Sequence, residues 1–254
     1  MRTPVFLDAD GVLHCVLSTT AGHCTLDMDA VEQATTALLE GKGRAVLLVG
    51  EGSNFCSGGD VAAFAAADSP GSFVAGLAET LHAFVRAVTT SSAPVVAAVH
   101  GWATGAGMSL ACAADITVCG SSARFRPAYP AIGLSPDGGM TWTLPRLIGP
   151  ARARDLLLTD GVLGADEALR TGLVSRVVAD DDVRAEALSV ARQLAAKPPQ
   201  VLARVKALLH EGADRDLFAH LDAEAESIGE AAESPVGREG VRAFIERRPP
   251  RFPV

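Results

Sequence analysis

Two glycine clusters of the 254-residue sequence lie where main-chain N–H groups could bind a ligand. The first, FCSGGD, spans residues 55–60, and the second, HGWATGAGMSLACAAD, spans residues 100–115. Each follows an apolar run that is typical of a buried strand and precedes a stretch that can form a helix. Glycine lets the backbone approach a ligand closely, and the first N–H groups of a helix carry partial positive charge. The two corners could therefore aim two N–H donors at one oxygen, although each corner alone is equally typical of a tight turn.

The elements that would position these clusters follow an α/β pattern. Residues 4–19 contain two apolar runs around an Asp-Gly turn signal, which predicts a β-hairpin. Downstream, short apolar runs alternate with amphipathic stretches, as expected of strands that are buried on both faces by helices. The pattern predicts helices over residues 28–39, after Asp27, and over residues 72–88 and 106–113, with strands over residues 45–50, 94–99 and 115–119.

After residue 178 the pattern becomes entirely helical. These helices are too few and too short to bury a core of their own, so they must pack on the α/β body or on another subunit. We therefore divide the chain into a core, residues 1–192, and a helical region, residues 193–254. The predicted helices of the last part of the chain span residues 182–195, 199–211, 214–229 and 238–247.

The composition excludes several classes of protein. Hydrophobic residues make up 48% of the chain and the net charge is −8, so the chain is globular and lacks the basic surface that nucleic acids need. The most apolar segment, residues 94–114, is interrupted by polar residues, and the N-terminal segment does not resemble a signal peptide. The five cysteines show no CxxC spacing, so we expect buried free thiols and no metal site. We expect a soluble, cytoplasmic protein with no nucleic-acid or membrane partner.

Four sequence blocks, taken in order, carry a specific resemblance. FCSGGD is followed by PVVAAVHGWATGAGMSLACAADI, then by ARFRPAYPAIGLSPDGGMTWTLPRLIG, then by ARARDLLLTDGVLGADEALRTGLVSRVV. Together they resemble the crotonase superfamily, also called the enoyl-CoA hydratase/isomerase family, and the similarity continues into EGVRAFIERRPPRF. The resemblance implies a crotonase-like spiral of ββα units that carries the acyl-CoA site, followed by a C-terminal helical trimerisation region. It also implies a homotrimer, or a hexamer made of two trimers.

The shared chemistry of this family is stabilisation of a thioester enolate by two main-chain N–H groups. Matching the motifs assigns these donors to Gly59 and Ala106, so the resemblance implies an oxyanion hole for an acyl-CoA thioester. Preorganised donors of this kind are each worth about 3 kcal/mol of transition-state stabilisation. Alanine in place of the family's commoner glycine at position 106 keeps the N–H group. Coenzyme A would arrive as part of the substrate, and no separate cofactor is expected.

The acid/base positions depart from those of the family's hydratases. Those hydratases use two glutamates, and the matching positions here are Ser109 and Tyr129. Neither side chain can act as a carboxylate base near neutral pH, because the pKa values of a hydroxyl and a phenol are too high. Asp137, within GLSPDGG, matches the catalytic aspartate of several double-bond isomerases and of the haloaryl-CoA dehalogenases in the superfamily. The alternative is that Asp137 caps a helix or closes a turn, as Pro-Asp-Gly sequences often do.

Five residues are expected to bind the substrate. Tyr129 and Ser109 occupy the former glutamate positions and could orient the substrate, or could simply belong to the core. Phe64 follows the first corner, where the family admits the acyl chain, and Trp142 belongs to the apolar surroundings of Asp137. Arg247 matches a basic position that the family uses near the phosphates of coenzyme A, often from a neighbouring subunit. An ordinary surface arginine is the alternative.

The sequence therefore predicts an acyl-CoA enzyme that shifts a double bond in an enoyl-CoA, with Asp137 as both acid and base. One carboxylate suffices, because the same group can take a proton from one carbon and return it to another. Three alternatives remain open: water addition by a hydratase, nucleophilic attack of Asp137 on an aryl-CoA as in the dehalogenases, and acyl-CoA binding without catalysis.

Overall fold

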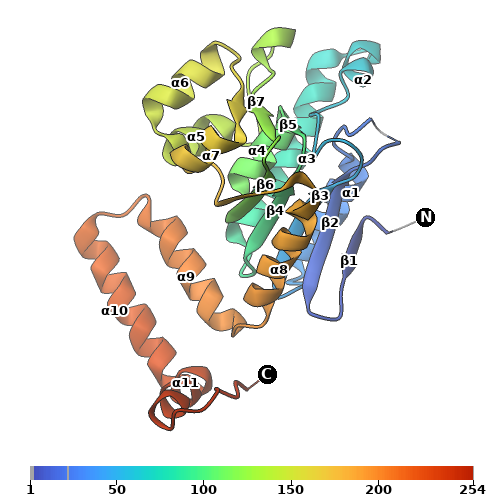
Figure 1. The fold of residues 1–254 in the computed structure, drawn as a ribbon. Helices are drawn as coiled ribbons and strands as arrows, with labels where there is room; N and C mark the ends of the chain where they lie inside the picture. Colours follow the sequence, from blue (N-terminus) through green and yellow to red (C-terminus); the bar gives the residue numbers. More distant parts are fainter. Residues whose placement is uncertain (1–2, 22, 254) are drawn as a thin grey trace.

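A six-stranded sheet forms the centre of the structure, a computed structural model that describes residues 3–21 and 23–253 (Figure 1). The first two strands are antiparallel, which confirms the predicted hairpin, and all other neighbours in the sheet are parallel. The strand order is β1-β2-β3-β4-β6-β9. The strands are β1 (Val5–Leu7), β2 (Val12–Ser18), β3 (Ala45–Gly50), β4 (Val95–Val99), β6 (Ile116–Gly120) and β9 (Arg176–Val178).

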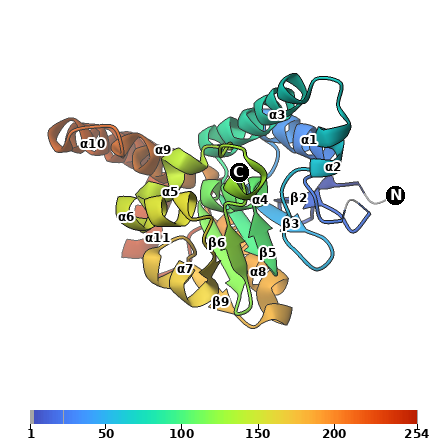
Figure 2. The same cartoon turned by 90° about the horizontal axis from the view of Figure 1, so that it is seen from above.

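Helices cover both faces of this sheet, as Figure 2 shows. Along β3, Val46 and Leu48 belong to the larger apolar cluster, whereas Leu47, between them, belongs to the cluster on the opposite face. Because successive side chains of a strand point to opposite faces, a strand covered on both sides is apolar throughout. Every residue of β3 and β4 is accordingly buried. The covering helices are α1 (Met28–Leu39) and α3 (Pro70–Thr90) on one face and α8 (Val183–Ala195) on the other.

A second, three-stranded sheet joins the segments that follow β4 and β6. Its strands are β5 (Trp102–Thr104), β7 (Arg124–Arg126) and β8 (Leu163–Gly164), with β5 parallel to β7 and β7 antiparallel to β8. The helices of this part of the molecule are α2 (Val61–Ala66), α4 (Ala106–Ala113), α5 (Met140–Ile148), α6 (Pro150–Leu158) and α7 (Ala165–Thr171), with 3-10 turns η1 (Pro130–Ile132) and η2 (Asp180–Asp182).

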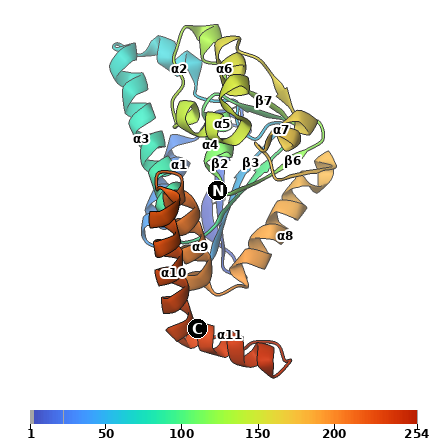
Figure 3. The same cartoon turned by 90° about the vertical axis from the view of Figure 1, so that its left-hand side faces the viewer.

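The last three helices form an arm that extends away from the sheet (Figures 1 and 3). This C-terminal arm consists of α9 (Pro199–Gly212), α10 (Leu217–Glu233) and α11 (Pro235–Ile245). Neither α9 nor α10 contains a buried residue among those described, and α11 buries only Val236 and Ala243. None of the helices in the described ranges is long and apolar enough to cross a lipid bilayer.

The predicted helices and strands are present, with shifted ends where local signals were overlooked. The helix predicted over residues 238–247 begins at Pro235, because the Ser234 side chain accepts a hydrogen bond from Gly237 N and proline suits the first helical position. Residue 192, where the sequence analysis divides the chain, lies within α8, and the arm itself begins at Pro199. The four C-terminal helices follow one another without a strand, as predicted.

Candidate active site

The two glycine corners lie against each other. Cys56 of the first corner forms a bridge with Ala103 of the second, and Thr104 N donates a hydrogen bond of 2.9 Å to Cys56 O. A Cβ atom at Gly107 would lie 2.5 Å from the same oxygen, and one at Gly58 would lie 3.3 Å from Thr104 O. These approaches are too close for a side chain at Gly107 and tight at Gly58, so the glycines are needed to bring the corners together.

Both proposed N–H donors line the cavity that begins at these corners. Ala106 is the first residue of α4, after Gly105 at a positive φ of 53°, and Gly59 precedes the cap of α2. Both residues line one cavity. Among the described residues, no group accepts a hydrogen bond from the N–H of either one. Their N–H groups are therefore available to a ligand, and Ala106 N–H lies at the positive end of a helix.

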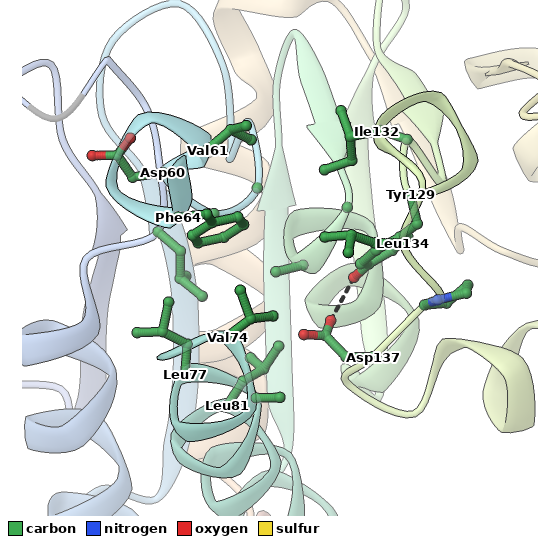
Figure 4. Close-up of a pocket in the computed structure, with 18 of the residues that line it drawn as sticks. Asp60, Val61, Phe64, Val74, Leu77, Leu81, Tyr129, Ile132, Leu134 and Asp137 are labelled. Carbon is green, nitrogen blue, oxygen red and sulfur yellow. Dashed lines mark hydrogen bonds between the residues drawn. The ribbon is translucent and has the colours of Figure 1, made fainter. Parts of the chain in front are cut away.

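The cavity has a volume of about 670 Å³ and mainly apolar walls. Figure 4 shows side chains of α2 and α3 on one side and the segment from Tyr129 to Asp137 on the other. The ring of Phe64 covers Gly59, since a Cβ atom there would lie 2.5 Å from Phe64 Cζ. Phe64 also packs edge-on against Phe73, with ring centroids 6.2 Å apart. Such walls suit an apolar chain, whereas the two corners offer polar groups at one place.

Asp137 supplies the cavity with a carboxylate oxygen that no group of the described residues binds. Tyr129 Oη donates a hydrogen bond of 2.5 Å to Asp137 Oδ1 (Figure 4). The other oxygen, Oδ2, has no hydrogen-bond partner among the described residues. Helix α5 is preceded by Gly139 and has no side-chain cap, so Asp137 does not cap that helix. Its main-chain carbonyl accepts a hydrogen bond of 3.2 Å from Met140 N, so Asp137 does begin a turn, as the other alternative stated. The other carboxylate of the cavity wall, that of Asp60, accepts from Ala62 N and Ala63 N and caps α2.

Tyr129 remains a hydrogen-bond donor over the whole neutral range. Burial, and then the neighbouring Asp137 carboxylate, raise the pKa of Tyr129 well above that of an ordinary phenol. A phenol that stays protonated can hold Oδ1 of Asp137 but cannot serve as a base. The pair therefore provides one fixed carboxylate with one free oxygen.

The peptide unit after Asp137 is held by two further side chains. Ser109 Oγ donates a hydrogen bond of 3.0 Å to Asp137 O and lies 3.5 Å from Tyr129 Oη. Gly138 N donates a hydrogen bond of 3.1 Å to Nε2 of His82, on α3. The sequence analysis overlooked His82, because it lies 56 positions from Gly138 and no local motif marks it. A search for half-buried polar residues on α3 could have found it.

The structure brings together five of the residues singled out in the sequence: Gly59, Phe64, Ala106, Tyr129 and Asp137 all line the cavity.

Three other residues expected to bind substrate lie elsewhere in the described chain. Ser109 is fully buried behind the cavity wall and contacts Asp137 instead. Trp142 lies 3.7 Å beneath the Arg146 guanidinium and lines a separate groove between α5 and α9. Position 142 faces away because Met140 and Leu144 point into the core, and a helix turns by 200° over two residues. Arg247 follows α11 in the arm and lines none of the cavities described.

Comparisons with known proteins show the family of the chain. The family model "Enoyl-CoA hydratase/isomerase" matches residues 17–253. A Rhodobacter capsulatus protein named "Probable enoyl-CoA hydratase" is 42% identical over 226 residues, which cover 88% of this chain and 87% of that protein. The 1,2-epoxyphenylacetyl-CoA isomerase of Escherichia coli is 37% identical over 214 residues, covering 82% of this chain and 80% of that enzyme.

Solved structures carry the same fold. The crystal structure of an enoyl-CoA hydratase from Polaromonas sp. JS666 superposes with a TM-score of 0.90 at 34% sequence identity, covering 98% of this chain and 99% of that one. The match confirms the predicted α/β, crotonase-like fold class. With the family model spanning nearly the whole sequence, the chain belongs to the enoyl-CoA hydratase/isomerase family of the crotonase superfamily.

Proposed function

We propose that this protein is an acyl-CoA enzyme that shifts the double bond of an enoyl-CoA thioester, with Asp137 as the only acid/base group. One observation carries the proposal: Tyr129 Oη donates to Oδ1 of Asp137 at 2.5 Å, while Oδ2 has no partner in the part of the chain that the structure describes, and Asp137 lines an apolar cavity. The same cavity is lined by Gly59 and Ala106, whose N–H groups have no acceptor among the described residues.

The proposed reaction uses these groups in turn. The thioester oxygen accepts hydrogen bonds from Gly59 N–H and Ala106 N–H, which stabilise the negative charge that develops there. Oδ2 of Asp137 removes a proton from the α-carbon of a 3-enoyl thioester, and the electron pair moves into a dienolate. The same oxygen, now protonated, returns the proton to the γ-carbon, which gives the 2-enoyl thioester. Proton and charge balance without another reactant.

Water addition is the first alternative, because relatives of this chain are named hydratases. A hydratase must hold a water molecule and move its protons, for which two acid/base groups are suited. Here Ser109 is buried and bound to Asp137 O, and the raised pKa of Tyr129 keeps the phenol protonated. The carboxylate of Asp60 caps α2. These contacts favour isomerisation over hydration. A dehalogenase-like attack by Asp137 and binding without turnover are the remaining alternatives.

A panel of 2-enoyl, 3-enoyl and haloaryl-CoA thioesters tests the proposal. Isomerisation leaves the mass unchanged and creates the ultraviolet absorbance of a conjugated thioester, whereas hydration adds the mass of water and dehalogenation releases halide. Asp137→Asn should lower kcat on a 3-enoyl-CoA by about 10²- to 10⁴-fold while thioester binding persists. Asp216→Asn, which alters the cap of α10 far from the cavity, is the matched control. Wild-type turnover by the Asp137→Asn variant would refute the proposed role.

We also propose that the protein is a homotrimer, or a hexamer of two trimers, assembled through the C-terminal arm. The arm exposes large apolar side chains such as Phe218 and Phe244, which a stable soluble chain would cover. Sedimentation velocity tests this directly. The double variant Phe218→Asp/Phe244→Asp should sediment as a smaller species than the wild type, and Leu39→Asp, an exposed apolar position outside the arm, should not. A wild type that stays monomeric at all concentrations would refute the assembly.

A further inference from the structure

We infer that His82 and Ser109 are positioning residues, which clamp the peptide unit between Asp137 and Gly138 and so fix the direction of the Asp137 carboxylate. The inference rests on the proposed function of Asp137. It assigns a role to His82, which lies outside the cavity wall, and replaces the expected substrate contact of Ser109 with a different one.

The two contacts hold opposite ends of one peptide unit. Its carbonyl, Asp137 C=O, accepts a hydrogen bond of 3.0 Å from Ser109 Oγ, and its N–H, on Gly138, donates one of 3.1 Å to His82 Nε2. In a trans peptide the C=O and N–H point in opposite directions. Ser109 belongs to α4 and His82 to α3, so α4 holds the carbonyl of the peptide unit and α3 holds its N–H group.

Besides the clamp, main-chain hydrogen bonds hold the two ends of this segment: Leu134 N donates to Tyr129 O at 3.0 Å, and Met140 N donates to Asp137 O at 3.2 Å. Residues 134–137 belong to no helix or strand, and Gly138 and Gly139 both adopt positive φ, at 60° and 77°. A Cβ atom at Gly138 would lie 2.6 Å from Ser109 Cβ, so the backbone packs directly on α4. The torsion ψ of Asp137 sets the direction of its side chain relative to this peptide plane, so a plane held on α3 and α4 restricts where the carboxylate points. Without the clamp, Tyr129 alone would hold the carboxylate.

The geometry sets a chemical requirement on each partner. Nε2 of His82 must carry a lone pair to accept from Gly138 N–H, so the proton of the neutral ring resides on Nδ1. Glutamine can replace this acceptor, because its Oε1 is as many bonds from Cα as Nε2 is in histidine. Leucine fills similar space but accepts nothing. At position 109, alanine removes the donor with the smallest change of volume.

Steady-state kinetics on a 3-enoyl-CoA tests the clamp. His82→Leu and Ser109→Ala should each lower kcat about 10- to 100-fold, since a displacement near 1 Å of a reacting group has effects of this size. KM, and the affinity for a saturated acyl-CoA measured by calorimetry, should stay within about twofold, because no substrate contact is lost. His82→Gln should recover most of kcat. In an Asp137→Asn background, His82→Leu should cause no additional loss of the residual rate, because His82 acts only through Asp137.

Any other result contradicts either the clamp or the proposed role of Asp137. If His82→Leu and Ser109→Ala both keep the wild-type kcat while Asp137→Asn is inactive, the clamp is wrong and the proposed function stands. If His82→Leu lowers the residual rate of Asp137→Asn further, His82 acts on the substrate directly and is not a positioning residue. If Asp137→Asn itself turns over normally, the proposed function fails first. Should His82→Leu not fold, Ser109→Ala applies the same criteria, both alone and in the Asp137→Asn background.

Discussion

The α/β core and the C-terminal arm differ in how they bury apolar side chains. In the core, every residue of β2, β3 and β4 is buried, and Phe84 has no exposed surface. In the arm, α9 and α10 bury nothing among their described residues, and Phe218 and Phe244 are 78% and 85% exposed. The two regions are nonetheless continuous parts of one chain, joined from α8 to α9 (Figure 3).

This difference assigns the two regions different sources of stability. The core gains its free energy of folding by removing apolar surface from water within one chain. The arm keeps most of its apolar surface exposed, so its helices depend on capping, on ion pairs and on surfaces outside the chain. The residues that line the cavity beside the two glycine corners all belong to the core, whereas the arm contributes none of them.

The largest contrast should appear when one phenylalanine of each region is truncated. Phe84→Ala, on α3 within the core, should lower the free energy of unfolding by about 3–5 kcal/mol, because it leaves a cavity in close-packed surroundings. Phe218→Ala, on α10, should change it by less than about 0.5 kcal/mol in the dissociated chain and should weaken association instead. Urea unfolding at several protein concentrations measures both effects. Equal losses at low concentration would contradict the contrast.

A smaller effect is expected at Lys206, which ties the arm to the core. Its Nζ atom, on α9, donates to Val88 O at 2.8 Å and to Ala93 O at 3.3 Å, and forms an ion pair with Asp115 at 2.7 Å. Lys206→Met should cost about 1–3 kcal/mol of unfolding free energy, because it leaves these acceptors without their donor. The cost in unfolding free energy stays small because the Asp115 side chain is partly exposed, so water can solvate its carboxylate when the ammonium group is removed.

Lys42→Met is the matched control for this substitution. Within residues 3–21 and 23–253, Lys42 forms an ion pair with Glu40 alone, and both side chains are more than half exposed. Exposed pairs of this kind contribute between about 0 and 1 kcal/mol. If both variants unfold at the same urea concentration as the wild type, Lys206 does not join the regions in the way the contacts indicate.

The sequence was most informative where burial is complete. The runs AVLLVG and PVVAAV predicted β3 and β4, because strands covered on both faces are apolar at every position. The strands β5, β7 and β8 were not predicted, since two or three residues are too few for a periodicity. The beginning of α11 was placed late, although Ser234 followed by proline is a recognisable start.

The sequence predicted which main-chain groups line the cavity better than it predicted which side chains do. Glycines mark the places where the backbone must approach itself closely, so Gly59 and Ala106 could be located by motif. Which side chains reach Asp137 depends on helix packing, and a motif does not encode it. His82 was therefore missed. Trp142 was wrongly expected to line the cavity with Asp137, because Met140 and Leu144 are the residues of α5 that point into the core and Trp142 lies on another side of the helix.

The smallest expected effect concerns the acid sensitivity of the arm. Glu239 on α11 accepts hydrogen bonds from Nη1 of Arg248 at 2.7 Å and from Arg251 N at 2.7 Å. The hydrogen bond from Arg248, and then that from Arg251 N, lower the pKa of Glu239 to about 2. Because the pKa is lower in the folded chain, this stabilisation is present above the ordinary glutamate value, near 4.5, and is lost as the pH falls towards 2. Carbon NMR of the side-chain carboxyl should give a midpoint near 2, which Arg248→Met should raise. A midpoint near 4.5 in the wild type would show that the tail does not hold α11, and that the arm depends on other chains even more than its exposed apolar surface indicates.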